Sequence, residues 1–142
     1  MLNWIGIAAI NMAIAVALGA FGAHGLKNIA SLQQLEWWHT ATLYLFIHAL
    51  GLLMIGLLIR LKHVTQTTAW LLQIGVIIFS GSLYAMTLGA PLWFGAITPI
   101  GGVIIWAGYL LLENVTSQII VRTFLATMIV AVFCEIIARV MK

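Results

Sequence analysis

The sequence predicts an all-α protein, a polytopic membrane helix bundle with four core transmembrane helices and a fifth one at the C-terminal end. The 142 residues are 64% hydrophobic and only 6% charged, and their mean hydropathy is +1.17. Apolar runs of about twenty residues, the length that a spanning helix needs, alternate with short polar gaps. Because soluble domains carry about 25% charged residues, this composition excludes a water-exposed surface over most of the chain.

The first apolar run, residues 3–23, predicts the first spanning helix. A cleaved signal peptide is the alternative reading of this run. The beginning of the chain carries no Lys or Arg, and the run exceeds the ~7–15 residues of a signal-peptide core, so a retained helix is favoured.

The next segment, 24–38, mixes polar residues with leucine and isoleucine at spacings of three. That pattern predicts a short amphipathic helix lying in the membrane interface. Trp37 and Trp38 at its end are expected at the level of the lipid headgroups. The second spanning helix is then expected over 39–59, up to a basic turn that begins with Arg60.

A third spanning helix is expected over 69–88, where Gly89 and Pro91 end it. The fourth is expected to begin with Thr98 as its cap and Pro99 in its first turn, where the missing N–H does no harm, and to end at residue 112.

The last apolar run, 119–138, contains Arg122 and Glu135 near its two ends. We favour a fifth spanning helix over an interfacial tail, because the run is long enough to span the membrane. The chain is therefore divided into a four-helix membrane domain, 1–112, and a C-terminal extension, 113–142.

The six Lys and Arg residues lie singly at the ends of apolar runs, so the lipid bilayer is the expected partner and nucleic acid is not. Arg60 and Lys62 share one loop, whereas Lys27 lies on the opposite side of the predicted bundle. This bias predicts a multi-pass protein of the cell inner membrane, or plasma membrane, with a cytoplasmic N-terminus. A fifth helix would move Arg139 and Lys142 outside and weaken the bias.

Four motifs occur in order along the chain: Gly19-Ala-Phe-Gly-Ala-His-Gly-Leu26, Thr40-Ala41 with Tyr44 and His48-Ala-Leu50, Phe79-Ser-Gly-Ser-Leu-Tyr84, and Ile97-Thr-Pro-Ile-Gly-Gly102. Together they resemble the domain-of-unknown-function 423 family of small integral membrane proteins, over about residues 1–112. The resemblance implies a four-helix membrane protein, and it implies no particular biochemical activity.

Polar side chains inside a membrane are costly, so each one raises a functional hypothesis. Facing one another, they would form a seam that binds a small molecule or relays a proton. The alternative, which we favour, is a set of interhelical hydrogen bonds worth ~0.6–2 kcal/mol each. The candidate seam consists of Asn11, Tyr44, His48, Gln73, Ser80 and Tyr84.

The first motif offers small residues that let two helices approach closely, so we take it as a candidate interface. Its members are Gly19, Gly22, His24 and Gly25. His39 and His48 point to opposite faces of one helix, and no ligand spacing of zinc or copper type occurs. A metal site from His24, Glu36 and His39 is a minor alternative, and we expect no metal, no cofactor and no catalytic residue.

These observations favour a non-catalytic accessory or structural subunit of a larger membrane complex, such as a respiratory or transport assembly, or a homo-oligomer. Its partners would be other membrane subunits or copies of itself. The alternative is a small transporter or channel that uses the polar residues around His48. A redox protein or enzyme is a third class, for which the sequence offers no acid–base pair.

Overall fold

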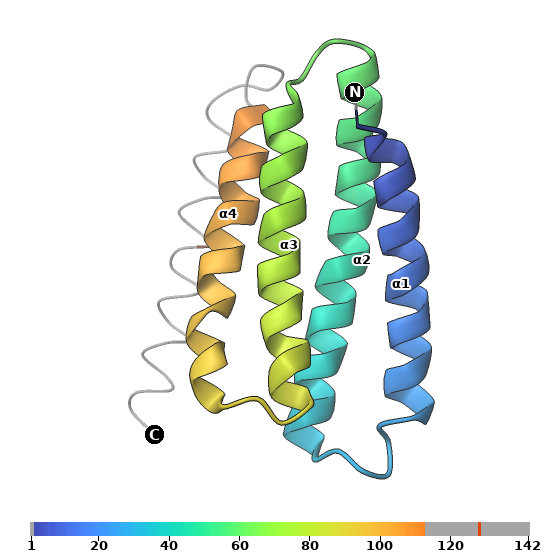
Figure 1. Cartoon of the computed structure of the whole chain (residues 1–142), viewed down its shortest axis with the longest axis vertical. Helices are drawn as coiled ribbons and strands as arrows, with labels where there is room; N and C mark the ends of the chain where they lie inside the picture. Colours follow the sequence, from blue (N-terminus) through green and yellow to red (C-terminus); the bar gives the residue numbers. More distant parts are fainter. Residues whose placement is uncertain (1, 113–127, 129–142) are drawn as a thin grey trace.

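The computed structural model describes residues 2–112 and residue 128, and residues 2–112 form a bundle of long helices that run up and down one axis (Figure 1). The four predicted spans are present: three long helices and a fourth stretch, Leu92–Leu110, which combines a short 3-10 helix with the last described helix, are each long and apolar enough to cross a membrane. The predicted fifth helix, 119–138, and the rest of the extension 113–142 lie outside the described residues. The elements are α1 Trp4–His24, α2 Leu32–Arg60, α3 Gln66–Thr87, the short 3-10 helix η1 Leu92–Ala96, and α4 Thr98–Leu110.

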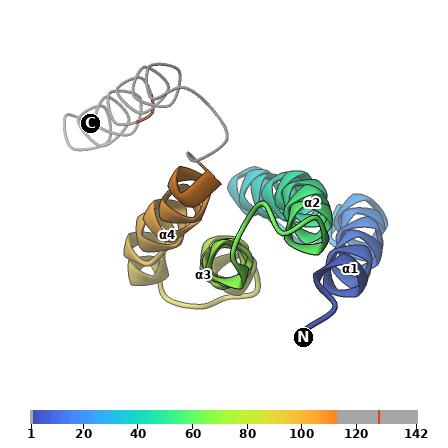
Figure 2. The same ribbon diagram turned by 90° about the horizontal axis from the view of Figure 1, so that it is seen from above.

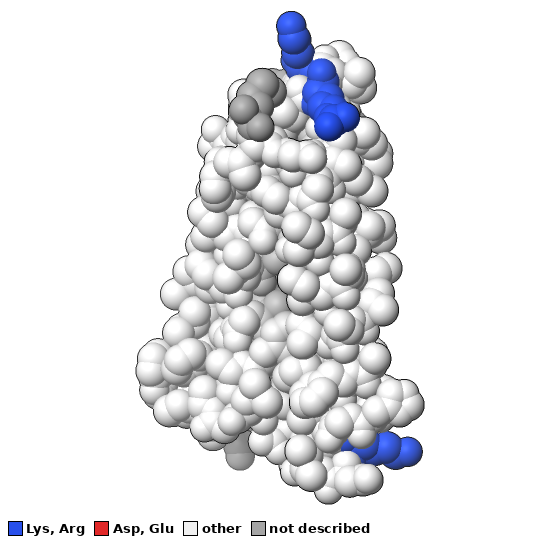
Figure 3. Space-filling view, turned by 45° about the vertical axis from the view of Figure 1, so that its right-hand side comes forward, with Lys and Arg blue, Asp and Glu red and all other residues white. Residues whose placement is uncertain are grey.

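Each long helix packs along the next one in the chain, so α1 and α4 lie at opposite edges of the bundle (Figure 2). The largest core cluster contains residues of all four long helices, among them Trp4, Leu52, Leu72 and Ile105. Apolar side chains also cover the outside of the molecule, as a bilayer requires. On the face that Figure 3 shows, Lys and Arg side chains lie only at the two ends of the bundle.

The first turns of α2 correct the prediction of a separate interfacial helix over 24–38. After a loop, Ser31 caps α2 through a reciprocal pair of hydrogen bonds with Gln34: the Ser31 hydroxyl accepts from the Gln34 N–H over 3.2 Å, and the Gln34 side chain accepts from the Ser31 N–H over 2.8 Å. The second span thus begins at Leu32 rather than at residue 39. Of the apolar residues at spacings of three, Leu32 and Leu35 belong to α2 itself, whereas Leu26 and Ile29 lie in the loop before it.

Trp38, which the sequence places at the level of the lipid headgroups, points into the bundle instead of towards the lipid. Its side chain is only 5% exposed and is buried among α1, α2 and α3. Tryptophan in a membrane protein is enriched at the interface because its N–H can reach water there. Here the indole N–H finds its acceptor inside the bundle, so the residue can be buried.

Two glycines allow α3 and α4 to touch through their backbones. A methyl group on Gly75 would lie 2.6 Å from the Ile105 nitrogen, and one on Gly101 would lie 2.5 Å from the Phe79 nitrogen. Helix packing in membranes relies on such small residues, because lipid provides no hydrophobic force that drives helices together.

The beginning of α4 partly follows the prediction. Pro99 lies in the first turn as expected, but Thr98 is already inside the helix and makes no capping hydrogen bond. Its hydroxyl instead lies 2.7 Å from the hydroxyl of Ser82 on α3. The prediction that Thr98 caps α4 was therefore wrong, and the threonine adds a contact between α3 and α4.

Candidate functional site: polar contacts between the helices

The six candidate seam residues lie in separate contacts, and the first of these joins α1 to α3. Asn11 donates through Nδ2 to Oε1 of Gln73 over 2.6 Å. Asn11 is only 8% exposed, so the amide pair lies in apolar surroundings, where an unpaired amide would be costly. The pair holds together two helices that are not consecutive in the chain.

Tyr44 and His48 belong to an aromatic group where α2, α3 and α4 meet. The Tyr44 ring stacks on Phe79 with centroids 4.5 Å apart, and the His48 ring lies 5.8 Å from the Tyr109 ring. Nδ1 of His48 lies 2.7 Å from the backbone oxygen of Tyr44. A carbonyl oxygen only accepts, so Nδ1 carries the hydrogen and, in a neutral ring, Nε2 is an acceptor.

Ser80 and Tyr84 tie α3 to the first half of α2. The Ser80 hydroxyl donates to the backbone oxygen of Ala41 over 2.9 Å. The Tyr84 hydroxyl donates to the Thr42 hydroxyl over 2.9 Å, and Thr42 in turn donates to the backbone oxygen of Trp38. None of these described hydrogen bonds reaches His48 or the Asn11–Gln73 pair.

Trp38 is the interhelical contact residue that sequence reasoning missed most clearly. Its Nε1 donates to the backbone oxygen of Leu18 over 2.8 Å, and its ring lies 4.5 Å from that of Tyr84. It therefore links α1, α2 and α3 at once. In the sequence, the spacing of four between Trp38 and Thr42 already indicates that both lie on one face of α2.

Gln34 and Thr87 form a second contact that the sequence did not suggest. Nε2 of Gln34 donates to the backbone oxygen of Thr87 over 3.0 Å, and the Thr87 hydroxyl donates to the backbone oxygen of Gln34 over 3.1 Å. This reciprocal pair fastens the beginning of α2 to the end of α3. Gln34 thus uses its oxygen for the cap of α2 and its nitrogen for the contact with α3.

The candidate interface motif makes contacts within the chain. A methyl group on Gly22 would lie 2.6 Å from Nε1 of Trp38, and one on Gly19 would lie 3.6 Å from the Thr42 methyl. Gly22 therefore lets α2 approach α1, whereas a methyl group on Gly19 would make only an ordinary van der Waals contact. Gly25 follows the last residue of α1, His24, which is exposed to the surroundings.

The chemistry of this arrangement is that of helix association. Four of its donors bind a backbone oxygen of a neighbouring helix, those of Gln34, Trp38, Ser80 and Thr87. The described contacts pair no hydroxyl with a histidine or carboxylate that would activate it. Within residues 2–112, no three His, Cys, Asp or Glu side chains come close enough to hold a metal ion. Its clearest capability is to fix the helices relative to one another.

Comparison with known proteins identifies one family of membrane proteins. A family model described as "Protein of unknown function (DUF423)" matches residues 18–102, which include Trp38 and Tyr84 but not Asn11. A UPF0382 membrane protein of Staphylococcus saprophyticus is 46% identical over 117 residues, which are 82% of this chain and 98% of the relative. The UPF0382 membrane protein YwdK of Bacillus subtilis is 44% identical over 103 residues, 70% of this chain and 84% of the relative. No solved structure matches the chain.

Proposed function

Because this chain belongs to the DUF423 family, whose relatives above are named membrane proteins, we propose that it is a non-catalytic membrane component that associates with another membrane subunit or with a second copy of itself. Its part in such an assembly is structural. The association takes place within the membrane, helix against helix.

The outer face of α1 is the observation that carries this proposal. Exposed alanines recur at every fourth position, at Ala9, Ala13 and Ala17, with Ala20 beside them. At 3.6 residues per turn these residues form one stripe, which the larger exposed side chains of Val16 and Ile10 flank on its two edges. Small residues at this spacing allow a second helix to approach closely.

The internal polar contacts also support a structural part, because they leave few polar side chains of the described residues free to line a substrate path. Ser80, Trp38 and Gln34 each bind a backbone oxygen of another helix, so these side chains are engaged inside the bundle. A substrate path would need such groups to face a lumen. A component that functions as a rigid unit in a larger assembly needs these side chains to hold its helices together.

The proposal is tested by adding bulk to the alanine stripe. We expect wild-type protein, extracted in mild detergent, to appear as a dimer or with a copurified membrane partner in native mass spectrometry. Ala13→Leu should abolish that association, because the added side chain keeps a second helix away. The exposed position of Ala13 predicts that the monomer still folds.

Ile14→Phe is the matched control, because it adds similar bulk at an exposed position of α1 that lies outside the stripe, about 100° around the helix from Ala13. It should leave the association intact. Wild-type protein that occurs only as a monomer without a partner would contradict the proposal. So would an equal loss of association in the Ala13→Leu and Ile14→Phe variants.

A transporter or channel is the second candidate, and His48 is the observation that favours it. Its Nε2 accepts no hydrogen bond from any residue of 2–112, although the residue lies in the middle part of α2. A proton or cation path would use that atom. Proton and cation fluxes into liposomes that are the same for wild-type and His48→Ala protein would remove this support.

A further inference from the structure

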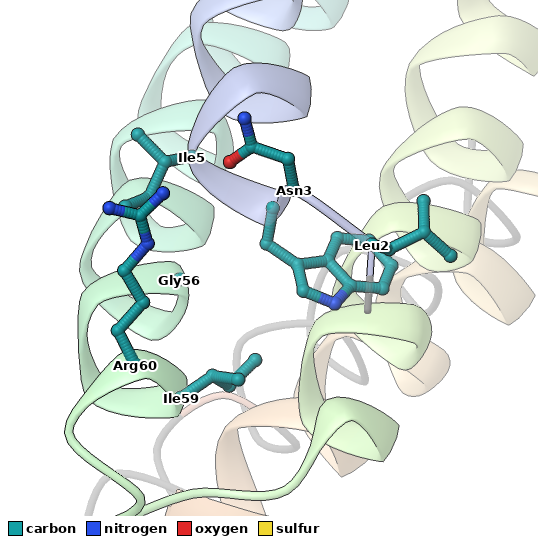
Figure 4. A pocket seen from close by; sticks show the side chains of 7 residues that line it. Leu2, Asn3, Ile5, Gly56, Ile59 and Arg60 are labelled. Carbon is teal, nitrogen blue, oxygen red and sulfur yellow. The ribbon is translucent and has the colours of Figure 1, made fainter.

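A small open pocket of about 170 Å³ lies where the beginning of α1 meets the end of α2 (Figure 4). Both helices end here, so the pocket lies at the level of the lipid headgroups rather than of the acyl chains. Its walls are formed by Leu2, Asn3, Trp4, Ile5, Gly56, Ile59 and Arg60.

Gly56 is the reason that the two helices meet closely enough to form this pocket. A methyl group on Gly56 would lie 3.1 Å from both the nitrogen and a side-chain carbon of Ile5. The backbone of α1 therefore rests almost directly on α2. Its first turn, with its free N–H groups, is held beside the end of α2.

The pocket gathers positive charge without a negative partner. The N-terminal end of α1 carries about half a positive charge, and the helix itself cannot pair the N–H groups of Trp4 and Ile5. The only side-chain cap there is Asn3, which accepts from the Gly6 N–H over 3.2 Å, and the first turn contains no acidic residue.

Arg60 adds a full positive charge to this end of α1. Its side chain runs back along α2 towards Ile5, so that the guanidinium lies beside the first turn of α1 (Figure 4). Within residues 2–112 the only carboxylate is that of Glu36, at the opposite end of α2 and about 36 Å away along the helix. Two positive groups side by side are stable when an anion lies between them.

Trp4 supplies an independent sign that a ligand belongs here. It lines the pocket and is only 2% exposed, and its buried Nε1 has no hydrogen-bond acceptor among the described residues. A buried N–H group without a partner is uncommon in folded proteins. A small rotation of the indole would bring this N–H to the pocket, where an oxygen-rich anion would offer the missing acceptor.

We propose that this pocket binds the phosphate group of an anionic phospholipid. The Arg60 guanidinium forms paired hydrogen bonds to the phosphate oxygens, and the N–H groups at the beginning of α1 donate to the same group. Leu2, which is 48% exposed, adds an apolar side chain to the outer wall of the pocket and favours a lipid over a free phosphate. The proposal is independent of the association through the alanine stripe.

The test uses the full-length protein, freed of lipid in detergent and titrated with phosphatidylglycerol or phosphatidylcholine in native mass spectrometry. We expect wild-type protein to retain one phosphatidylglycerol and to retain phosphatidylcholine less well. Arg60→Gln should weaken phosphatidylglycerol binding about tenfold or more, as the loss of a charged hydrogen bond predicts. Trp4→Phe, which keeps an aromatic ring but removes the N–H, should weaken it severalfold.

Lys27→Gln is the matched control, because Lys27 is exposed in the loop at the other end of the bundle. It removes the same charge and should leave the retained lipid unchanged. Equal effects of Arg60→Gln and Lys27→Gln, or equal retention of the two lipids, would overturn the proposal. Displacement of phosphatidylglycerol by inorganic phosphate would show that the ligand is a soluble anion and not a lipid.

Discussion

At the scale of the residue, polar side chains inside the spans repeatedly bind a backbone oxygen that already belongs to a helix. Trp38 does so at Leu18, and Ser80 does so at Ala41. A carbonyl oxygen has two lone pairs, so it accepts a second hydrogen without losing its helical one. Each such side chain ties two helices together without breaking either helix.

The Asn11–Gln73 pair is different because both partners are side chains, which makes it testable by a double-mutant cycle. We expect Asn11→Ala and Gln73→Ala to be coupled by about 0.6–1.7 kcal/mol in the free energy of unfolding. Reversible unfolding of the four proteins of the cycle in mixed micelles measures this coupling free energy. Effects that add within about 0.3 kcal/mol would show that the pair contributes no interaction of its own.

Residue-scale contacts were only partly predictable from the sequence. The spacing of four placed Tyr44 and His48 on one face of a helix, and their rings do stack, with centroids 5.7 Å apart. Their partners Phe79 and Tyr109 could not be predicted. Periodicity identifies which residues share a face, but it leaves open how each helix is rotated towards its neighbours.

At the scale of the element, hydropathy predicted the four spans. It misplaced the beginning of α2, because a polar segment there is part of the helix. Segment 32–38 is polar enough to lie outside the hydrocarbon, yet it continues the helix of α2. The capping box of Ser31 and Gln34 was visible in the sequence as a serine followed three residues later by a glutamine. Reading it as a helix start would have corrected the boundary.

The contact between α3 and α4 gives a prediction with an internal control. Gly101→Ala should lower the free energy of unfolding by about 1–3 kcal/mol, because the new methyl group would meet the Phe79 backbone, which cannot move aside. Thermal or denaturant unfolding of the purified protein measures the change.

Gly81→Ala is the matched substitution, since Gly81 also lies in a helix and a methyl group there would meet nothing within 4 Å. It should stabilise the protein slightly, by about 0.5–1 kcal/mol, because alanine favours the helix. Equal destabilisation by both substitutions would contradict close backbone packing at Gly101.

At the scale of the whole molecule, the described basic residues lie only at the two ends of the bundle. Arg60 and Lys62 lie at one end, together with the beginning of α1, and Lys27 lies at the other. The sequence predicted this separation because loops follow directly from the spans. It could not give the packing of the bundle, which depends on glycine contacts between residues far apart in the chain.

We infer a cytoplasmic N-terminus from this charge distribution, and it predicts which end of the bundle a reagent outside the cell can reach. In a Cys134→Ser background, a cysteine placed at Asn28 should react with a membrane-impermeant maleimide added to intact cells. A cysteine placed at Lys62 should react only after the membrane is opened. The reverse pattern would invert the proposed orientation.

The unequal lengths of the helices have a consequence for how the protein fits its bilayer. α2 has 29 residues and is about 43 Å long, whereas the hydrocarbon layer is about 30 Å thick. Tilting alone would need about 46°, beyond the usual range of about 0–40°, and α2 is fastened to its shorter neighbours. The extra length is therefore accommodated by protrusion: the polar first turns of α2 extend into the headgroup layer and set the depth of the protein. In a thicker or thinner membrane, we expect the bundle to shift along the bilayer normal and not to lean.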